Sequence, residues 1–575
     1  MRTHLQDALE RALSSGHDRV VVSDGATLVH GNDLSAAAAV IQDALCGAGV
    51  EQGDRVLIEL DRSVDYIAAV VACVRSGVTY VPVAANTPSA RRTSIADHCA
   101  AAATISAGPE GPGVERIAEE IAGRSAGRHC DNPLAYIIYT SGTTGAPKGV
   151  AVSHSALWGF VSLDERIAMN SPEGCLCCAS VSFDATVYEI WPTLLGGGTL
   201  LLYSGDSVHL DELCGVISQT APDRAFLTTK LFQAIEQSSR RDVLFSIGNL
   251  FVGGETISPQ SFSRAREVMG DRLRAAYGPT EAVVFTTLEQ SDGSFADEVP
   301  IGKAMRGKDV LVLDDQLSAC RPGDVGEIFI RGGLADGYYA NLAATATRFL
   351  PCPEGSGAVM YRSGDLGVVG EDGTITFRGR ADHQVKIRGY RVELGAIESF
   401  YLTQSEISNC VCVVVDADTS APKLCLYFVS TQARVNATTL RRCADSALEQ
   451  YMIPDLFVQV EEFATSESGK IDRSLLPKPY LNRGEIGLST EYSAPEGAVE
   501  STIAGLFGLE LRIADVGADD NFYELGGNSL NSMSLLQSLS DAGLVASARE
   551  LFSNPSPRKL ATTISDRKEN AGVGA

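Results

Sequence analysis

Short apolar runs alternate with longer helical stretches through the first half of the chain. Between Arg55 and Val83 the segment DRVLIEL predicts a strand, DYIAAVVACVRSG a helix and TYVPV a second strand. The pattern recurs at LAYIIYT, TLLLYS, RAFLTT, NLFVGGE and LRAAYG. Apolar strands separated by helices are typical of parallel α/β layers, so a large α/β domain is expected.

The pattern changes further along the chain. From about Val299 to Thr376 the runs are shorter and richer in glycine, which predicts an antiparallel, β-rich lobe. After it, one strand (HQVKIRGYRV), a helix (ELGAIESFYLTQ) and two strands (NCVCVVVDA, KLCLYFVS) predict a small, mobile α+β subdomain. A polar connector then precedes a helical bundle. The expected ranges are 1–381 and 382–480 for the large and small subdomains, 481–495 for a linker, 496–566 for the bundle and 567–575 for a frayed tail.

Charge and composition exclude several classes of protein. The 575 residues include 47 Lys+Arg and 72 Asp+Glu, a formal net charge of −25, and this field repels nucleic-acid phosphates. The N-terminus lacks the apolar core of a signal peptide, and the longest apolar run, Ile67–Val74, is far too short for a membrane span. A cytoplasmic protein without nucleic-acid or membrane partners is therefore expected.

The cysteines and histidines do not form a metal-binding pattern. The chain has 14 cysteines, and two clusters, at 175–178 and 410–412, lie in strand-like apolar segments without CxxC or Cys/His spacing. All eight histidines are isolated. We expect reduced, buried cysteines that pack as small apolar side chains, and no zinc site.

A string rich in glycine and hydroxyls, YTSGTTGAPKGV, follows a predicted buried strand at 139–150. Its small residues let backbone amides approach a phosphate closely, and Lys148 can add positive charge. It is not a Walker loop, because no Gly-Lys-Ser/Thr closes it onto a helix. For a bare Ser/Gly/Thr string, a mobile surface turn would be the alternative.

Together with further segments in order, this string gives the chain a resemblance to the adenylation domains of nonribosomal peptide synthetases, within the adenylate-forming superfamily. The matching segments are VRSGVTYVPV, FDATVYEI, AYGPTE, GEIFIRGGLADGY, YRSGDL, GRADHQVKIRGYRVEL, YMIP and SGKIDRSL. Two places depart from the family: AANTP stands where Asp-Pro-x-Tyr-Pro is usual, and LVHGNDL blurs the earliest motif. Neither departure touches the expected catalytic groups.

The resemblance implies a site that binds ATP and Mg²⁺. A carboxylate attacks the α-phosphate while pyrophosphate leaves, so cations and fixed donors supply the catalysis. Glu281 matches the magnesium-binding carboxylate and Tyr277 the ring that stacks on adenine. Asp365 matches the carboxylate that holds the ribose hydroxyls, and Arg380 supports it. The other implied ATP-binding residues are Thr140, Ser141, Gly142, Thr143, Thr144, Gly145, Lys148, Gly254, Glu255, Gly278 and Thr280.

Two lysines of the small subdomain match catalytic positions of the family. By resemblance Lys470 bridges the substrate carboxylate and the phosphates in the first half-reaction. Lys386 alternates with apolar residues in HQVKIRG, which puts it on the exposed face of a strand. In the family this face enters the site for the second half-reaction, after rotation about a hinge that matches Asp382. Domain alternation explains why both lysines are needed.

Asp184, in FDATVYEI, matches the residue that pairs with the α-ammonium of an amino acid. The other pocket positions carried over are Ala185, Tyr188, Phe226, Phe251, Gly253, Ala276, Val284, Phe285 and, again, Lys470. Apart from Asp184 and Lys470 the set is uncharged, so a charged substrate side chain would be buried without a partner. Four aromatic rings disfavour a tryptophan-sized substrate. The set resembles pockets for valine or isoleucine, and other apolar or aromatic amino acids are the alternative.

The last motif, DNFYELGGNSL, precedes helical periodicity. Alone, Gly-Gly-Asn-Ser would be an ordinary helix cap. The whole string resembles a peptidyl carrier domain, whose serine, here Ser529, carries 4′-phosphopantetheine. HHxxxDG and GxSxG motifs are absent from the sequence, so we expect an adenylation–carrier didomain that hands its amino acid on in trans.

The implied function is ATP-dependent loading of an amino acid onto the chain's own carrier domain. Its expected partners are the amino acid, a phosphopantetheinyl transferase and a downstream condensation or tailoring enzyme; the need for an MbtH-like activator stays open. Two alternatives compete with this function. One is an acyl-CoA ligase, which Asp184 and the carrier motif oppose. The other is a non-catalytic carrier with an inactive adenylation lobe, which Lys470 and Glu281 oppose.

Overall fold

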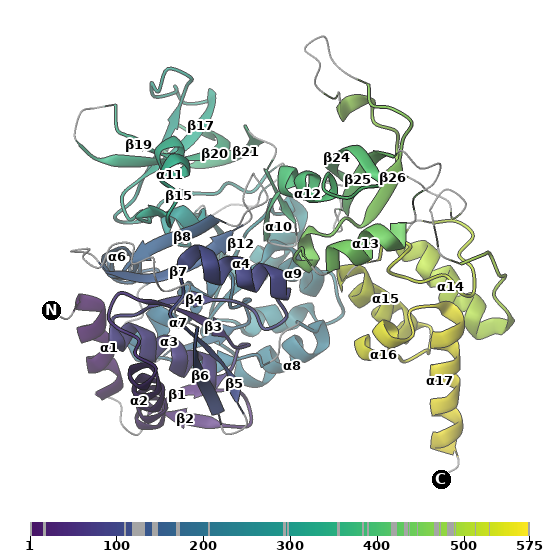
Figure 1. The fold of residues 1–575 in the computed structure, drawn as a ribbon, viewed down its shortest axis with the longest axis horizontal. Coiled ribbons are helices and arrows are strands. Elements are labelled where there is room, and N and C mark those ends of the chain that lie inside the picture. The colour runs from purple at the N-terminus through teal and green to yellow at the C-terminus, as the bar shows by residue number, and fades with distance from the viewer. Residues whose placement is uncertain are drawn as a thin grey trace. The chain divides into compact units, whose positions relative to one another are not determined.

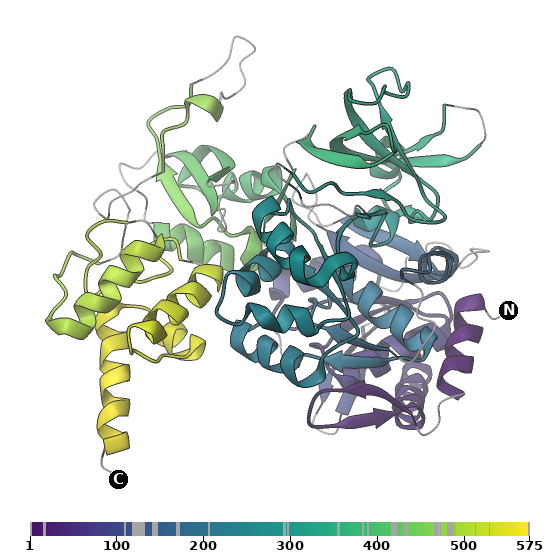
Figure 2. The same ribbon diagram turned by 180° about the vertical axis from the view of Figure 1, so that it is seen from behind.

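The structure is a computed structural model in which the chain forms two compact units, Met1–Ser141 with Pro147–Arg391, and Gly142–Ala146 with Val392–Ala575 (Figures 1 and 2). It describes residues 3–14, 19–108, 111–117, 133–140, 148–167, 173–204, 208–290, 295, 298–353, 357–381, 384–387, 390–415, 423–430, 435, 437–445, 447–464, 471, 473–479, 483, 488, 490–511, 513–527 and 529–572. The domain boundaries expected from the sequence stay predictions.

The first unit is built on two large sheets. In strand order, the nine-stranded sheet contains β15 (Lys303–Ala304), β14 (Thr287–Leu288), β13 (Leu273–Tyr277), β12 (Asn249–Gly253), β11 (Arg224–Thr228), β9 (Gly174–Cys177), β10 (Thr199–Leu202), β1 (Val20–Ser23) and β2 (Leu28–His30). The seven-stranded sheet contains β18 (Gly337–Tyr338), β8 (Lys148–Ser153), β7 (Leu134–Thr140), β4 (Thr79–Pro82), β3 (Arg55–Glu59), β5 (Ala103–Gly108) and β6 (Gly111–Arg116). Parallel pairs form the middle of both sheets, as the repeated strand–helix pattern predicts.

Two apolar helices share one core with both sheets. In α3 (Val64–Ser76) nine consecutive residues, Tyr66–Val74, are buried, and α7 (Ala185–Gly196) is buried from Ala185 to Leu194. One hydrophobic cluster joins these helices to inward side chains of both sheets, among them Val56 and Leu200. A helix that is apolar all round belongs inside a layered core, so these two run between the sheets.

The outer faces of the sheets are covered by further helices. Side chains of α8 (Leu210–Thr220), α9 (Thr229–Glu236) and α10 (Pro259–Met269) pack on the nine-stranded sheet. Helix α4 (Ser89–Cys99) packs on the seven-stranded sheet. The remaining helices of this part are α1 (His4–Ser14), α2 (Gly31–Gly47) and α6 (His154–Leu163). Since helices cover both faces at the middle of each sheet, central strands such as β3, β4 and β12 are buried on both sides.

The glycine-rich segment forms the expected antiparallel lobe. Its five strands are β16 (Asp309–Leu313), β17 (Val325–Arg331), β20 (Val359–Val369), β19 (Phe349–Pro351) and β21 (Ile375–Arg380), with α11 (Leu342–Arg348) beside them. All their pairings are antiparallel.

The second unit combines a small α+β part with a helical bundle. A three-stranded sheet of β24 (Ile407–Val415), β25 (Lys423–Ser430) and β26 (Leu456–Gln459) accompanies α12 (Leu394–Tyr401) and α13 (Ala437–Asp445). The bundle contains α14 (Gly497–Leu511), α15 (Ser529–Asp541), α16 (Ala548–Ser553) and α17 (Pro557–Gly572), joined by one apolar core. The predicted fold class is therefore confirmed.

One local prediction differs from the structure. The single strand expected at HQVKIRGYRV is two short strands, β22 (Gln384–Ile387) and β23 (Tyr390–Glu393), paired with each other. Helix α17 extends to Gly572, and the bounds predicted for the tail stay a prediction. In the connector, Arg483 forms two hydrogen bonds of 2.7 and 2.8 Å with the buried Asp520, so this part of the polar linker lies against the bundle.

The cysteines of both predicted clusters are buried, and every cysteine in the described residues is a free thiol. Burial raises the pKa of Cys175 and of Cys410 to about 12, so both stay protonated near neutral pH. Within the described residues, no helix has both the length and the apolar character needed to cross a membrane.

Candidate active site

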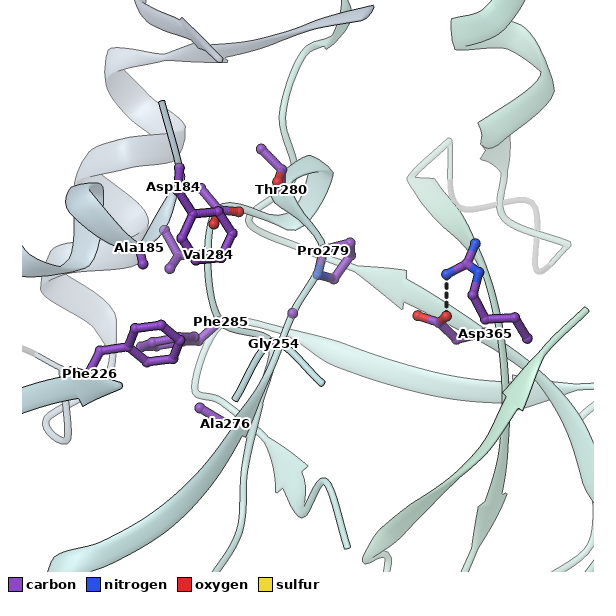
Figure 3. A pocket seen from close by; sticks show the side chains of 13 residues that line it. Asp184, Ala185, Phe226, Gly254, Ala276, Pro279, Thr280, Val284, Phe285 and Asp365 are labelled. Carbon is purple, nitrogen blue, oxygen red and sulfur yellow. Dashed lines mark hydrogen bonds and ion pairs between the residues drawn. The ribbon is translucent and has the colours of Figure 1, made fainter. Parts of the chain in front are cut away.

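A cavity lies in the first unit at the carboxyl ends of parallel strands β11, β12 and β13 (Figure 3). In sheets of this kind ligands bind at that edge. The cavity holds about 610 Å³ between atoms, part of it open to solvent. Its lining consists of Phe183, Asp184, Ala185, Phe226, Gly254, Ala276, Gly278, Pro279, Thr280, Val284, Phe285, Asp365 and Arg380.

The turn after β13 forms one wall of the cavity. Val283 and Val284 have φ of 53° and 65°, a left-handed conformation that is costly for β-branched residues. A Cβ on Gly278 would lie 2.1 Å from the carbonyl oxygen of Val284, so only glycine fits there. The buried Lys308 donates to the carbonyl oxygens of Ala282 and, at 2.9 Å, Gly333. These contacts hold the strained turn in place.

Asp184 stands at the start of α7, and its side chain forms no capping hydrogen bond. It is buried and lines the cavity, near Val284 in Figure 3. One turn later, Glu189 accepts hydrogen bonds from the backbone N–H groups of Cys178 (3.1 Å) and Ala179 (3.0 Å), and burial raises its pKa to about 7. Glu189 thus ties α7 to the end of β9 and fixes where Asp184 stands.

The apolar end of the cavity is closed by packed rings. The Phe285 ring lies 5.4 Å from that of Phe226, 5.0 Å from that of Tyr188 and 6.1 Å from that of Phe251, measured between centroids. Phe226 and Phe285 line the cavity, whereas Tyr188 and Phe251 pack against Phe285. Gly253 ends β12 beside Ala276. The pocket residues expected from the sequence are therefore gathered in one place, apart from Lys470, which lies outside the described residues.

At the polar end, Asp365 accepts hydrogen bonds on both carboxylate oxygens. The Tyr277 hydroxyl donates to Oδ2 at 2.5 Å, and Arg380 pairs with Oδ1 from the neighbouring strand β21. Burial is the main cause that raises the pKa of Tyr277 well above its ordinary value, and the negative charge of Asp365 raises it further. The phenol therefore stays protonated and donates the hydrogen bond. The sequence-predicted ribose and adenine residues are thus in contact with one another.

Glu281 lies in the short 3-10 helix η3 (Thr280–Ala282) and is 1% exposed. Its Oε1 accepts a 2.5 Å hydrogen bond from the hydroxyl of Tyr338, whose ring lies 5.8 Å from Nζ of Lys148. The described residues contain no cluster of three or more His, Cys, Asp or Glu side chains that could hold a metal. One carboxylate fits Mg²⁺, which commonly takes one or two protein carboxylates and completes its shell with phosphates and water.

Some of the other site residues predicted from the sequence are described by the structure, and others are not. Thr140 ends β7, Gly254 lines the cavity, and Glu255 lies 3.8 Å from Nζ of Lys230. Lys386 belongs to β22, and Ser529 is the first residue of α15, where helix amides favour a phosphate. Ser141, Gly142, Thr143, Thr144, Gly145, Asp382 and Lys470 lie outside the described residues.

The sequence missed several residues of this site. Phe183 and Pro279 line the cavity, and they lie inside the motifs FDATVYEI and AYGPTE, so the motifs could have indicated them. Tyr338, which contacts Glu281, ends the motif GEIFIRGGLADGY. No pattern along the chain indicates that contact, because 57 positions separate the two residues.

Comparisons with known proteins identify the family of the chain. The family model of AMP-binding enzymes matches residues 9–339, and that of the phosphopantetheine attachment site matches residues 499–564. The chain is 34% identical to malpibaldin synthetase of Mortierella alpina over 93% of the chain and 10% of that protein. It is 32% identical to surfactin synthase subunit 2 of Bacillus subtilis (strain 168), over 96% of the chain and 16% of that protein. The chain thus spans about a tenth to a sixth of the length of these relatives.

Among solved structures, the chain is similar to holo-PA1221, described as an NRPS protein with adenylation and PCP domains bound to a vinylsulfonamide inhibitor. The TM-score is 0.82 and the identity 27%, over 97% of this chain and 96% of that one. The fold, the cavity and these matches define the class: the chain belongs to the AMP-binding enzyme family. Within it, the chain is an adenylation domain followed by a peptidyl carrier domain, of the nonribosomal peptide synthetase type. Such domains use ATP, Mg²⁺ and 4′-phosphopantetheine.

Proposed function

We propose that the chain activates a branched aliphatic amino acid, valine or isoleucine, as its adenylate and loads it onto its own carrier domain. The single observation that carries this proposal is the continuous cavity. It has the Asp184 carboxylate and an apolar floor at one end, and the Asp365–Arg380 pair at the other. An amino acid and a nucleotide would fit side by side there, with the carboxylate of one facing the α-phosphate of the other.

In the first step the amino-acid carboxylate must approach the α-phosphate of ATP in line, although both groups are negatively charged. An oxygen of the amino-acid carboxylate bonds to the α-phosphorus, and the bond to the pyrophosphate oxygen breaks. Asp184 pairs with the α-ammonium, while Asp365 accepts the ribose hydroxyls. Glu281 would hold Mg²⁺, which would supply positive charge to the phosphates when bound. Holding both reactants in line converts a bimolecular step into a unimolecular one.

In the second step the carrier supplies the nucleophile. Ser529 would carry phosphopantetheine, whose thiol would form the thioester with the acyl group while the bond from the acyl carbon to AMP breaks. A phosphopantetheinyl transferase is the partner that Ser529 requires, and a condensation or tailoring enzyme is the partner that consumes the product.

Substrate choice follows from the apolar end of the cavity. The Phe285 ring is packed against the rings of Phe160, Tyr188, Phe226 and Phe251, so the floor cannot easily recede to admit a larger side chain. Ala185, Ala276 and Val284 complete an uncharged lining. A charged substrate side chain would lose its hydration there without gaining a partner. A short, branched, apolar side chain suits these walls best.

Amino-acid-dependent ATP–pyrophosphate exchange over a panel of amino acids tests the proposal. Valine and isoleucine should give the highest kcat/KM, within about 10–200-fold of each other, because one methylene contributes only ~1–3 kcal/mol. Lysine, aspartate and tryptophan should give little exchange. Preference for a charged or aromatic amino acid would overturn the substrate assignment, and absence of exchange with every amino acid would overturn the activity.

The ammonium-binding role of Asp184 predicts a separate result. Asp184→Ala and the isosteric Asp184→Asn should both raise the KM for the amino acid by about 100-fold or more, because a buried ammonium would lose its counter-ion. The KM for ATP is the internal control and should change little. An unchanged amino-acid KM in Asp184→Asn would contradict the role, since that variant removes only the charge.

A further inference from the structure

The strand that carries Asp365 is distorted where this residue stands. In the pairing of β17 with β20, Glu327 lies opposite Leu366 and Phe329 opposite Arg362, so three residues of β20 face only Ile328. These three residues are Ser363, Gly364 and Asp365. Such a bulge re-aims side chains and leaves backbone groups without ladder partners. Gly364, with φ of 78°, takes the left-handed conformation that the bulge needs.

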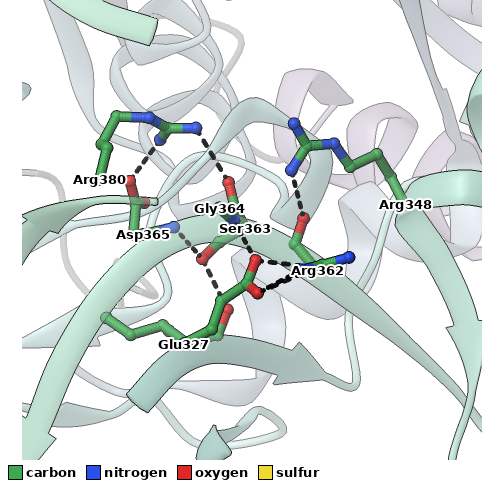
Figure 4. A network of polar contacts seen from close by, with 8 residues as sticks. Glu327, Arg348, Arg362, Ser363, Gly364, Asp365 and Arg380 are labelled. Carbon is green, nitrogen blue, oxygen red and sulfur yellow. Dashed lines mark hydrogen bonds and ion pairs between the residues drawn. The ribbon is translucent and has the colours of Figure 1, made fainter. Parts of the chain in front are cut away.

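Side chains replace the missing ladder bonds (Figure 4). The Gly364 N–H donates to Oε1 of Glu327 at 3.1 Å. The Ser363 hydroxyl donates to the Ile328 carbonyl at 2.6 Å and accepts from the Asp365 N–H at 3.0 Å. The same Glu327 carboxylate holds Arg362 in a forked pair at 2.8 to 3.0 Å.

We propose that Glu327 is a positioning residue of the nucleotide site: by binding the Gly364 amide it fixes the bulge, and so sets how selectively Asp365 holds the ribose. The inference rests on the ribose-binding role proposed for Asp365. The Arg362 side chain is 49% exposed, so the ion pair itself contributes little stability. What Glu327 supplies is an acceptor at a fixed place on the neighbouring strand.

The Asp365 carboxylate has room for this task. Within the part of the chain that the structure describes, Oδ1 accepts from Arg380 and Oδ2 from Tyr277, and a carboxylate offers about four lone-pair positions. The remaining positions can accept hydrogen bonds from two ribose hydroxyls. Both bonds form only if the carboxylate is held at the right position and orientation relative to the ribose. Arg380 and Tyr277 fix the carboxylate oxygens of Asp365, and the bulge fixes its backbone.

The test compares ATP with 2′-deoxyATP, which lacks one ribose hydroxyl. Both are used in pyrophosphate exchange with the amino acid that gives the highest rate in the panel, and the ratio of kcat/KM values is measured. A hydrogen bond to a charged group contributes ~1.5–3 kcal/mol, so the wild type should prefer ATP by about 10- to 100-fold. Glu327→Ala should lower this preference to about threefold or less, mainly through KM. Glu327→Gln keeps an oxygen acceptor on a side chain of the same length and should retain most of the preference for ATP.

Two reference variants keep the outcomes separate. Asp309→Ala removes a carboxylate that pairs with Arg331 at 3.0 Å on strands β16 and β17 of the same sheet, away from the bulge, and should keep the wild-type preference. Asp365→Asn should lose it; if it does not, the ribose role of Asp365 fails. If Asp365→Asn loses the preference while Glu327→Ala keeps it, the positioning role of Glu327 is overturned.

Folding is checked by thermal unfolding. Should Glu327→Ala fail to fold, Glu327→Asp replaces it, because the shorter side chain keeps its charge but withdraws the acceptor from Gly364. Glu327→Asp should then lose preference for ATP while Glu327→Gln retains it. Equal loss of activity with both nucleotides in Glu327→Asp would overturn the inference.

Discussion

Lys470→Ala is expected to reduce ATP–pyrophosphate exchange by at least about 10²–10³-fold, because it removes a positive charge from the point where negative charge develops in the transition state. The assignment comes from the resemblance of SGKIDRSL to the family motif. A charge needed mainly in the transition state should lower kcat far more than it raises either KM. Near-normal exchange in Lys470→Ala would contradict the assignment.

Lys386→Ala is the matched control for that result, because it removes the same charge from the same predicted subdomain. If the subdomain alternates between two orientations, Lys386 should be dispensable for exchange and needed for transfer to the carrier. Exchange should stay near wild type while loading of the carrier slows. Equal loss of both reactions in Lys386→Ala would argue against alternation.

The second large effect concerns Ser529, at the first position of α15. Ser529→Ala should abolish carrier loading completely, because no other hydroxyl would accept the phosphopantetheine group from coenzyme A. Intact-mass spectrometry should show one phosphopantetheine on the wild type, and a further gain equal to the amino acid once ATP is added. Ser529→Ala should show neither.

Pyrophosphate exchange is the control for Ser529→Ala and should stay near the wild-type rate, because the cavity is formed by residues of the other compact unit. A phosphopantetheine found on Ser529→Ala would show that another residue is the attachment point. A wild type that the transferase cannot modify would return Ser529 to the role of a helix cap.

Much of the fold could be predicted because the local pattern of apolar and polar residues indicates which segments are buried. Nine consecutive apolar residues at Tyr66–Val74 are consistent only with an element enclosed on all sides, and α3 is such a helix. Short glycine-rich runs predicted the antiparallel lobe that β16, β17, β19, β20 and β21 form. The prediction at HQVKIRGYRV was wrong because a continuous apolar–polar alternation does not show where a strand turns back on itself.

For the site, the sequence by itself determined which residue types are available and in which motifs, and the resemblance gave them roles. Only the tertiary structure decided that Asp184 of one motif and Asp365 of another line the same cavity. It also decided that Glu327 binds the amide of Gly364, 37 positions away, and that Phe285 closes the pocket floor. The physical reason is that strand register, bulges and ring packing arise from pairing between distant segments, and no local pattern of apolar and polar residues encodes such a pair.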